Sequence, residues 1–347
     1  MKTILAVSVD FPRPDYDEQW NAKQTKEEAT SMLSTLCRHS DRWDTLEIHS
    51  FRLLEPELDW RKMLPGSLEK LKRLSLFEDI KPIMETMKHW QPQIRELHVQ
   101  TTKEQLQTLS QAPWLFNIRD LTLKCNHYIT FQMTELLHAC RSLRYLHIDV
   151  GTWALKKNGK VITLDSLTEL IFNSQFPLSS LHMPSITCIT LGDRVLLLED
   201  LSYPCLKRLS ITSCYPNYLY KHLRVPLLDY LFLDYLEDRY NVNQPEIPMA
   251  RIVIIHRAQF PEAWWISMLR ASSGVLEELE LVDVRIGNDF IGLFTRKDQC
   301  VRTVREFRFR NRQYQRWVWT PSTGWEFLGM WKPVTILLLS TLYVPRR

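Results

Sequence analysis

One short apolar pattern recurs along most of this chain. In the segment 143–148, Leu143, Leu146 and Ile148 follow the spacing L-x-x-L-x-L. Just before it, apolar residues at 133, 136, 137 and 140 follow the helical spacing i, i+3, i+4, i+7. The segment therefore predicts a helix with one apolar stripe that leads directly into a short strand.

The same strand pattern returns along the sequence. The first apolar residue of each pair is Leu46, Leu74, Leu97, Leu121, Leu146, Leu170, Ile189, Leu209, Leu231, Ile252, Leu279 and Phe307. Successive copies are 19 to 28 residues apart, close to the leucine-rich-repeat period of about 20–29 residues. A single strand cannot bury its apolar residues alone, but parallel stacking of successive copies creates a continuous core. We therefore predict an α/β leucine-rich-repeat solenoid, a curved parallel sheet of about twelve strands with helices or irregular turns on the convex side.

The segments between strands differ along the chain. Capping boxes at 25–28 and 102–105, and Pro261 before a tryptophan pair, predict helices. The repeats from Leu170 to Ile252 are shorter. There, Pro184, Pro204 and Pro226 lie two residues before the first apolar strand position, and Pro248 lies one before it. Because proline favours an extended chain and cannot donate to a ladder, we expect turns at these positions.

The repeats suggest three parts. Residues 1–45 form an N-terminal cap with a strand and a helix, 46–310 hold the irregular repeats, and 311–347 form an aromatic, irregular C-terminal cap or one degenerate repeat. The apolar runs at 1–10 and 334–344 are both shorter than the roughly 20 residues of a membrane span. We interpret them as strands.

Composition and motifs argue against catalysis. The formal net charge is +4 and only nine glycines occur among 347 residues. The sequence has no phosphate-binding loop, nucleophile elbow, dinucleotide fingerprint or zinc-protease motif. Seven cysteines without C-x-x-C spacing favour buried thiols in a reducing compartment, the cytoplasm or the nucleus. We predict a non-catalytic protein without cofactor or metal.

The residues that alternate with the core positions should line the concave face, where we expect a protein or peptide partner. An apolar cluster stands among polar residues there, and such a patch indicates a partner site. Burial of this face under a cap or loop is the alternative. The candidate partner-binding residues are Tyr145, His147, Arg208, Tyr230, Phe232, Asp234, Arg251, Val253 and Ile255.

A second candidate is the segment 302–319, where arginines alternate with aromatic residues. Its basic patch consists of Arg305, Arg308, Arg310 and Arg312. This composition is typical of nucleic-acid or phosphate binding. It also fits a strand with Phe307 and Phe309 facing the core and arginines facing solvent. We favour the structural interpretation over nucleic acid as a partner, and we expect no membrane as a partner.

The chain resembles the fungal F-box/leucine-rich-repeat proteins. The resemblance is carried by the strand at 39–48, by 143–148, and by the proline-led strands at 184–191 and 204–211. It implies the substrate-recruiting half of a ubiquitin-ligase receptor. An F-box, a helical module that opens with Leu-Pro, is not visible ahead of the repeats. Adaptor binding is therefore expected only if an F-box is supplied upstream. The asparagine or cysteine that usually follows each strand is also mostly missing, which makes the repeats irregular.

Overall fold

The computed structural model forms two compact units, residues 1–206 with 222–224, and residues 207–221 with 225–347. Each unit is described by itself. The structure describes residues 5–9, 31–32, 34–48, 68–77, 93–100, 103–129, 132–153, 161–174, 178–192, 195, 201–212, 223–234, 247–310 and 315–330.

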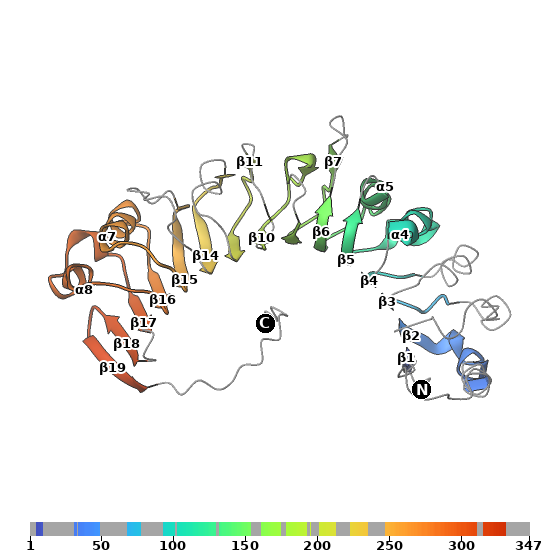
Figure 1. The fold of residues 1–347 in the computed structure, drawn as a ribbon, viewed down its shortest axis with the longest axis horizontal. Coiled ribbons are helices and arrows are strands. Elements are labelled where there is room, and N and C mark those ends of the chain that lie inside the picture. The colour runs from blue at the N-terminus through green and yellow to red at the C-terminus, as the bar shows by residue number, and fades with distance from the viewer. Residues whose placement is uncertain are drawn as a thin grey trace. The chain divides into compact units, whose positions relative to one another are not determined.

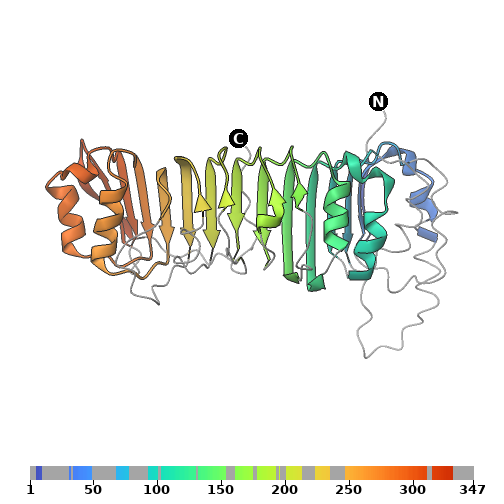
Figure 2. The ribbon, with the colours of Figure 1, turned by 90° about the horizontal axis from the view of Figure 1, so that it is seen from above.

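The first unit is built on parallel strands that are paired in chain order. They are β1 (Leu5–Val9), β2 (Trp43–Ile48), β3 (Arg73–Phe77), β4 (Glu96–Gln100), β5 (Asp120–Ile129), β6 (Tyr145–Trp153), β8 (Glu169–Asn173) and β10 (Cys188–Leu191). Two-residue strands pair separately, β7 (Ile162–Thr163) with β9 (Leu181–His182) and β11 (Leu201–Ser202) with β13 (Leu223–Arg224). In Figure 2 the green strands between residues 120 and 191 run side by side and point the same way.

The pairing is in register, so equivalent leucines stack across the strands. Leu97 pairs with Leu121, Leu121 with Leu146, and Leu146 with Leu170. These four side chains are at most 2% exposed. The hydrophobic stabilisation of this unit therefore comes from continuous apolar rows that each strand extends by one residue.

Short helices cover the buried face of the first unit. They are α4 (Lys103–Ser110) and α5 (Gln132–Ala139), with 3₁₀ turns η1 (Ser40–Arg42), η2 (Pro113–Asn117) and η3 (Leu178–Ser180). Figure 1 shows α4 and α5 on the same side of β4, β5 and β6. Leu109, Leu136 and Leu137 are fully buried, as the apolar spacing predicts. Among the residues that the structure describes, no helix lies on the opposite side of these strands. In both units, we call the side of the strands that faces away from the helices the open face.

The second unit continues the same design. Its parallel strands are β12 (Arg208–Thr212), β14 (Leu228–Asp234), β15 (Ala250–His256), β16 (Glu278–Val282) and β17 (Glu306–Arg310). An antiparallel hairpin, β18 (Gln315–Thr320) and β19 (Gly324–Met330), adds to β17. The α/β sheet is thus large and mostly parallel, with few helices.

Aromatic side chains fill the core beneath β15 to β17. Helix α7 (Glu262–Ala271) buries Trp264 and Trp265, and Phe260 stacks on Trp264 at 4.1 Å between ring centroids. Helix α8 (Asn288–Thr295) buries Phe294, which stacks on Phe307 of β17 at 4.6 Å. The 3₁₀ turn η4 (Gln299–Val301) leads into β17.

The two helices are also joined by a polar contact. Glu262 at the start of α7 accepts a hydrogen bond of 2.8 Å from the backbone N–H of Phe290 in the first turn of α8. A side chain at Gly287 would collide with this carboxylate, because a Cβ there would lie 2.1 Å from its Oε2. A carboxylate at a helix N-terminus is favourable, since it satisfies a free N–H and complements the helix dipole.

Every one of the twelve predicted strand positions lies in a strand, and the predicted turns before β10 and β12 are present at Pro184 and Pro204. The predicted helices after residues 102 and 261 are α4 and α7. The prediction of irregular chain after residue 311 is wrong for 315–330, which forms the hairpin. Our interpretations of residues 25–28 and 334–344 lie outside the described residues.

The core assignment predicts a strong effect of charge at position 146. Replacing the fully buried Leu146 by Asp should lower the free energy of unfolding by about 3–5 kcal/mol, because the carboxylate has no partner in the apolar row. Ile171→Asp, on the half-exposed side of the adjacent strand, serves as the matched control. Urea denaturation measures both variants, and equal losses would contradict the assignment.

Candidate partner-binding surface

The pairing of β14 with β15 corrects one part of the predicted site. Leu231 pairs with Val253, and Leu233 pairs with Ile255. Val253 and Ile255 are 1% and 0% exposed. They belong to the core rows, so our assignment of Val253 and Ile255 to the partner-binding face is wrong.

The error is a register slip of one residue, which exchanges the two faces of a strand. The run 252–255 consists of four β-branched apolar residues, so it shows no alternation of polar and apolar side chains. The positions of the prolines indicate the correct register. Pro226 lies two residues before the buried Leu228, and Pro248 lies two residues before Ala250, the residue that pairs with Leu228.

With this correction, four apolar side chains meet on the open face of the second unit. Tyr230 of β14 pairs with Ile252 of β15, and Phe232 pairs with Ile254. All four are half-exposed. We call Tyr230, Phe232, Ile252 and Ile254 the apolar block. The structure thus retains two predicted residues and adds two that the sequence analysis missed.

Charged residues of opposite sign flank the apolar block. Arg208 of β12 pairs with Tyr230 on one side. Glu278 and Glu280 of β16 pair with Ile252 and Ile254 on the other side. An apolar centre between charged margins is the usual anatomy of a protein interface.

Tyr230 and His256 are titratable side chains at the apolar block, and partial burial shifts the pKa of each. Burial raises the pKa of the Tyr230 hydroxyl, and the charge of Glu280 adds to this effect while Arg208 opposes it. The His256 ring lies edge-on to Phe232 at 5.0 Å between centroids. Burial lowers the pKa of His256, although the charges of Asp234 and Glu280 act in the opposite direction.

Asp234 is already held by a residue of this chain. The Nε of Arg257 donates to its Oδ1 at 2.8 Å, and the Nη2 of Arg257 contacts its Oδ2. A bidentate arginine–carboxylate pair is geometrically specific. Asp234, a predicted partner-binding residue, thus orients Arg257 at the margin of the open face.

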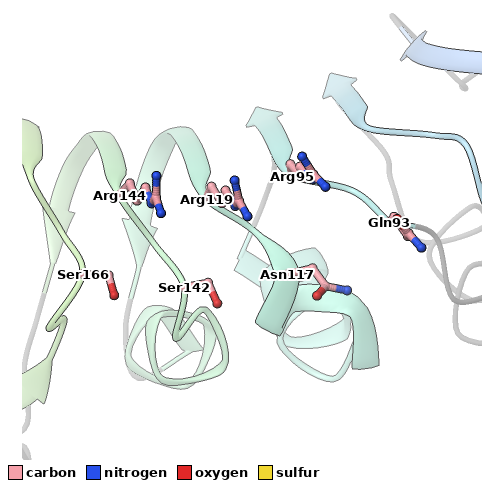
Figure 3. Close-up of a pocket in the computed structure, with 7 residues that line it drawn as sticks. All are labelled: Gln93, Arg95, Asn117, Arg119, Ser142, Arg144 and Ser166. Atoms are coloured by element: carbon pink, nitrogen blue, oxygen red, sulfur yellow. The ribbon is translucent and has the colours of Figure 1, made fainter.

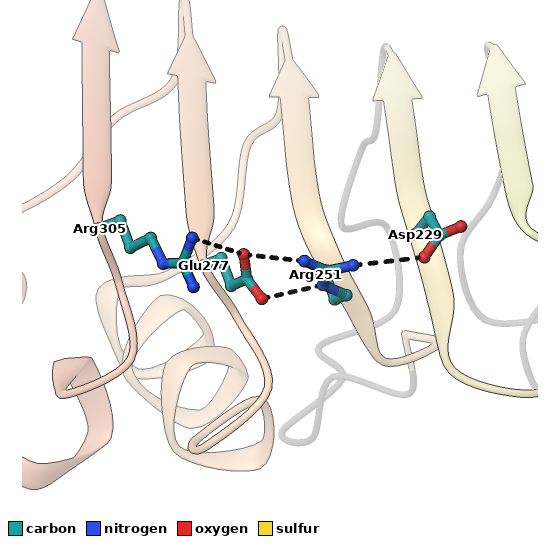
Figure 4. Close-up of polar contacts among 4 residues, drawn as sticks. All are labelled: Asp229, Arg251, Glu277 and Arg305. Atoms are coloured by element: carbon teal, nitrogen blue, oxygen red, sulfur yellow. Dashed lines mark hydrogen bonds and ion pairs between the residues drawn. The ribbon is translucent and has the colours of Figure 1, made fainter.

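Arg251 lies at a different edge from the apolar block. It belongs to a row of residues that we call the pre-strand row. Each stands two positions before the residue of its strand that aligns with the first leucine of the L-x-L pair, which in this unit is Leu231, Val253, Leu279 or Phe307. In this unit the row alternates in charge as Asp229, Arg251, Glu277 and Arg305 (Figure 4). Arg251 donates to Glu277 at 2.9 and 3.1 Å, and hydrogen bonding from Arg251 lowers the pKa of the Glu277 carboxyl. Arg251 therefore acts within an intramolecular charge ladder.

Tyr145 and His147 lie on the open face of the first unit, where His147 pairs with Thr122 and Ile171. Tyr145 pairs with Asp120 on one side and with Glu169 on the other. Burial lowers the pKa of His147; the charge of Lys124 adds to this effect. These two residues are half-exposed as predicted, but the first unit gathers no apolar block around them.

The alternative basic patch is largely neutralised by carboxylates. Arg308 donates to Glu306 at 2.6 Å and lies 3.7 Å from Glu280. Arg310 contacts Asp283 at 4.0 Å, and Arg305 belongs to the charge ladder of the pre-strand row. Arg312 lies outside the described residues. This pairing weakens the case for a nucleic-acid site, because a phosphate would have to compete with the resident carboxylates.

Phe307 is fully buried, as the structural interpretation of this segment expects, whereas Phe309 is half-exposed. A hollow of about 210 Å³ lies between β17 and β18. It is lined by Glu280, Arg308, Phe309, Arg310, Arg316, Trp317 and Val318.

In the described ranges of the chain, no group of three or more His, Cys, Asp or Glu side chains is arranged to hold a metal ion. Within the same ranges, no helix is long and apolar enough to cross a membrane. Cys37 and Cys140 are buried, and burial raises the pKa of each thiol to about 12. No family model and no curated protein sequence matches the chain.

The corrected register predicts different effects at two neighbouring isoleucines. Ile255→Ala should lower the free energy of unfolding by about 2–5 kcal/mol, because it leaves a cavity in a core row. Ile254→Ala should cost less than about 1 kcal/mol, since its side chain is half-exposed. Urea denaturation of the pair checks the assignment, and a larger loss for Ile254→Ala would reverse it.

The lowered pKa of His256 predicts a dependence of stability on pH. In the unfolded chain the imidazole takes up a proton near pH 6.5, but burial resists this in the folded state. The unfolded state then binds more protons, so stability should fall as the pH is lowered from about 7 towards 5. His256→Gln should flatten this decline, whereas the exposed His138→Gln should not. Urea midpoints across this pH range measure both.

Proposed function

We propose that the chain is a leucine-rich-repeat solenoid that binds a protein or peptide partner without catalysis. The observation that carries the proposal is the apolar block on the open face. Its four side chains come from two neighbouring strands and keep part of their surface exposed to water. A contiguous apolar patch of this kind has a cost in water that a partner would relieve.

The charged residues on both sides of the apolar block indicate which side chains a partner would present. A partner segment would place one or two apolar side chains over Phe232 and Ile254. A carboxylate on that segment would suit the side of Arg208, and a lysine or arginine would suit the side of Glu278 and Glu280. Such charge complementarity mainly fixes orientation and speeds association, while the apolar centre supplies most of the affinity.

The resemblance to F-box/leucine-rich-repeat proteins suggests a cellular role for this binding. The chain would recruit a substrate protein in the cytoplasm or nucleus, as the receptor half of a ubiquitin ligase does. An F-box supplied upstream would then bind the ligase adaptor. The residues described here bear on substrate capture alone.

Substitution of the two aromatic residues tests the proposal. Tyr230→Ala combined with Phe232→Ala should abolish capture of partners from a cell extract, because the centre of the interface is lost. The thermal melting temperature should change by less than a few degrees, since both side chains lie outside the core rows. Quantitative mass spectrometry of the captured proteins, beside a thermal melt, provides the measurement.

Ile171→Ala is the matched control, because Ile171 is a half-exposed apolar residue on the open face of the first unit. It should leave capture unchanged. A double variant that melts normally and retains every captured protein would show that the apolar block is not the binding site.

A further inference from the structure

Three arginines occupy consecutive positions of the pre-strand row in the first unit. Arg95, Arg119 and Arg144 stand just before β4, β5 and β6. The backbone fixes their alignment, since the N–H of Arg119 donates to the carbonyl of Arg95 at 2.8 Å and that of Arg144 to Arg119 at 2.7 Å. The arginines are therefore about 4.8 Å apart from strand to strand, and all three are exposed.

A second row of neutral polar side chains runs beside the arginines. Figure 3 shows the arginine side chains stacked in parallel, with Ser142, Ser166 and Asn117 projecting from the preceding turns. Together they line a hollow of about 460 Å³. Its complete lining is Gln93, Arg95, Asn117, Arg119, Ser142, Arg144 and Ser166, without a carboxylate among them.

The arginine row lacks any internal counter-charge. In the part of the chain that the structure describes, Arg95, Arg119 and Arg144 make no ion pair and no side-chain hydrogen bond. Other members of the pre-strand row in this unit are satisfied. Lys72 pairs with Asp44 at 2.7 Å, and the hydroxyl of Thr168 donates to the carbonyl of Arg144 at 3.1 Å.

The second unit shows how the fold uses arginines at this position for structure. There, Arg251 and Arg305 share the carboxylate of Glu277 (Figure 4). Alternating charges attract each other, whereas three like charges on adjacent strands repel. The leucine-rich core of the repeat therefore does not require three adjacent arginines. An external anionic ligand explains them better.

We propose that Arg95, Arg119 and Arg144 form a binding site for a phosphate group, with Ser142, Ser166 and Asn117 as additional hydrogen-bond donors. Guanidinium groups match the oxygens of phosphate with paired, charge-assisted hydrogen bonds. A phosphate dianion placed against Arg119 would lie between two further positive charges. The site belongs to the first unit and does not depend on the apolar block.

The surroundings favour a discrete phosphate over a long polyanion. Glu96 and Asp120 directly follow Arg95 and Arg119, and their side chains lie on the open face. Glu169, which follows Thr168, continues this line of carboxylates beside Tyr145. These carboxylates would repel a nucleic-acid backbone laid across the strands. The shared chemistry is thus a phosphate monoester or free phosphate, carried either by a protein side chain or by a small molecule.

The first experiment uses inorganic phosphate as the probe, compared with sodium chloride at equal ionic strength. Phosphate should raise the melting temperature of the wild-type chain, because it binds only the folded state. Isothermal titration calorimetry should show that Arg119→Gln weakens phosphate binding about 10-fold or more. Arg38→Gln, the same charge change at an exposed arginine outside the hollow, should leave binding unchanged.

A stability readout separates a binding role from a structural one. In phosphate-free buffer, Arg119→Gln should melt at or above the wild-type temperature, because the substitution removes repulsion between like charges. A variant that melts several degrees lower would make Arg119 a structural residue and would overturn the proposal. Wild-type protein that responds equally to phosphate and chloride would overturn it as well.

A second arm distinguishes the two sources of phosphate. Fluorescence anisotropy compares a degenerate peptide library with a central phosphoserine and the same library with serine. Tighter binding of the phosphorylated library, lost in Arg119→Gln, assigns the site to a phosphorylated protein. Equal binding of both libraries, with inorganic phosphate still bound, assigns it to a small phosphate compound. If neither probe binds in an Arg119-dependent way, the proposal fails.

Discussion

The in-register pairing of parallel strands is the constraint on which the rest of this structure depends. Each backbone ladder places equivalent residues of successive repeats side by side, so that Leu97, Leu121, Leu146 and Leu170 form one apolar row. The same ladder aligns every surface position. A residue type that repeats at one position becomes a continuous stripe, as with the three arginines before β4, β5 and β6. The apolar block and the charge ladder of the second unit arise in the same way.

Much of this design can be read from the sequence because the core rows are made of leucine at a regular spacing. An isolated strand cannot bury its apolar residues, so successive copies must stack on one another. The spacing of the leucines therefore predicts both the strands and their parallel order. The strands at all twelve predicted positions and the helix after Pro261 follow from such local rules. Of the predicted site, Tyr230 and Phe232 lie together on the open face because Leu231 and Leu233 take the two core positions of the L-x-L pair in β14.

The remaining features depend on information that local patterns do not contain. In β15, a run of β-branched residues conceals which side chains face the core, and only the position of Pro248 relative to Pro226 reveals it. The hairpin of β18 and β19 was missed because its aromatic residues do not follow the L-x-x-L-x-L spacing of the repeat. The arginine row was missed because the sequence analysis compared positions within the strands. Alignment of the residues before each strand would have brought Arg95, Arg119 and Arg144 into one column.

The antiparallel hairpin has a consequence for how such a protein can change in length. Each parallel strand offers its neighbour an edge of the same polarity, so a whole repeat can be inserted or deleted among them while the ladder is preserved. Beyond β17 the polarity reverses, because β18 pairs antiparallel with it and β19 antiparallel with β18. A further copy of the repeat would meet the wrong hydrogen-bonding pattern at that edge. Tandem duplication can therefore lengthen the run of parallel strands from β12 to β17, whereas the hairpin prevents a parallel strand from being added beyond β17.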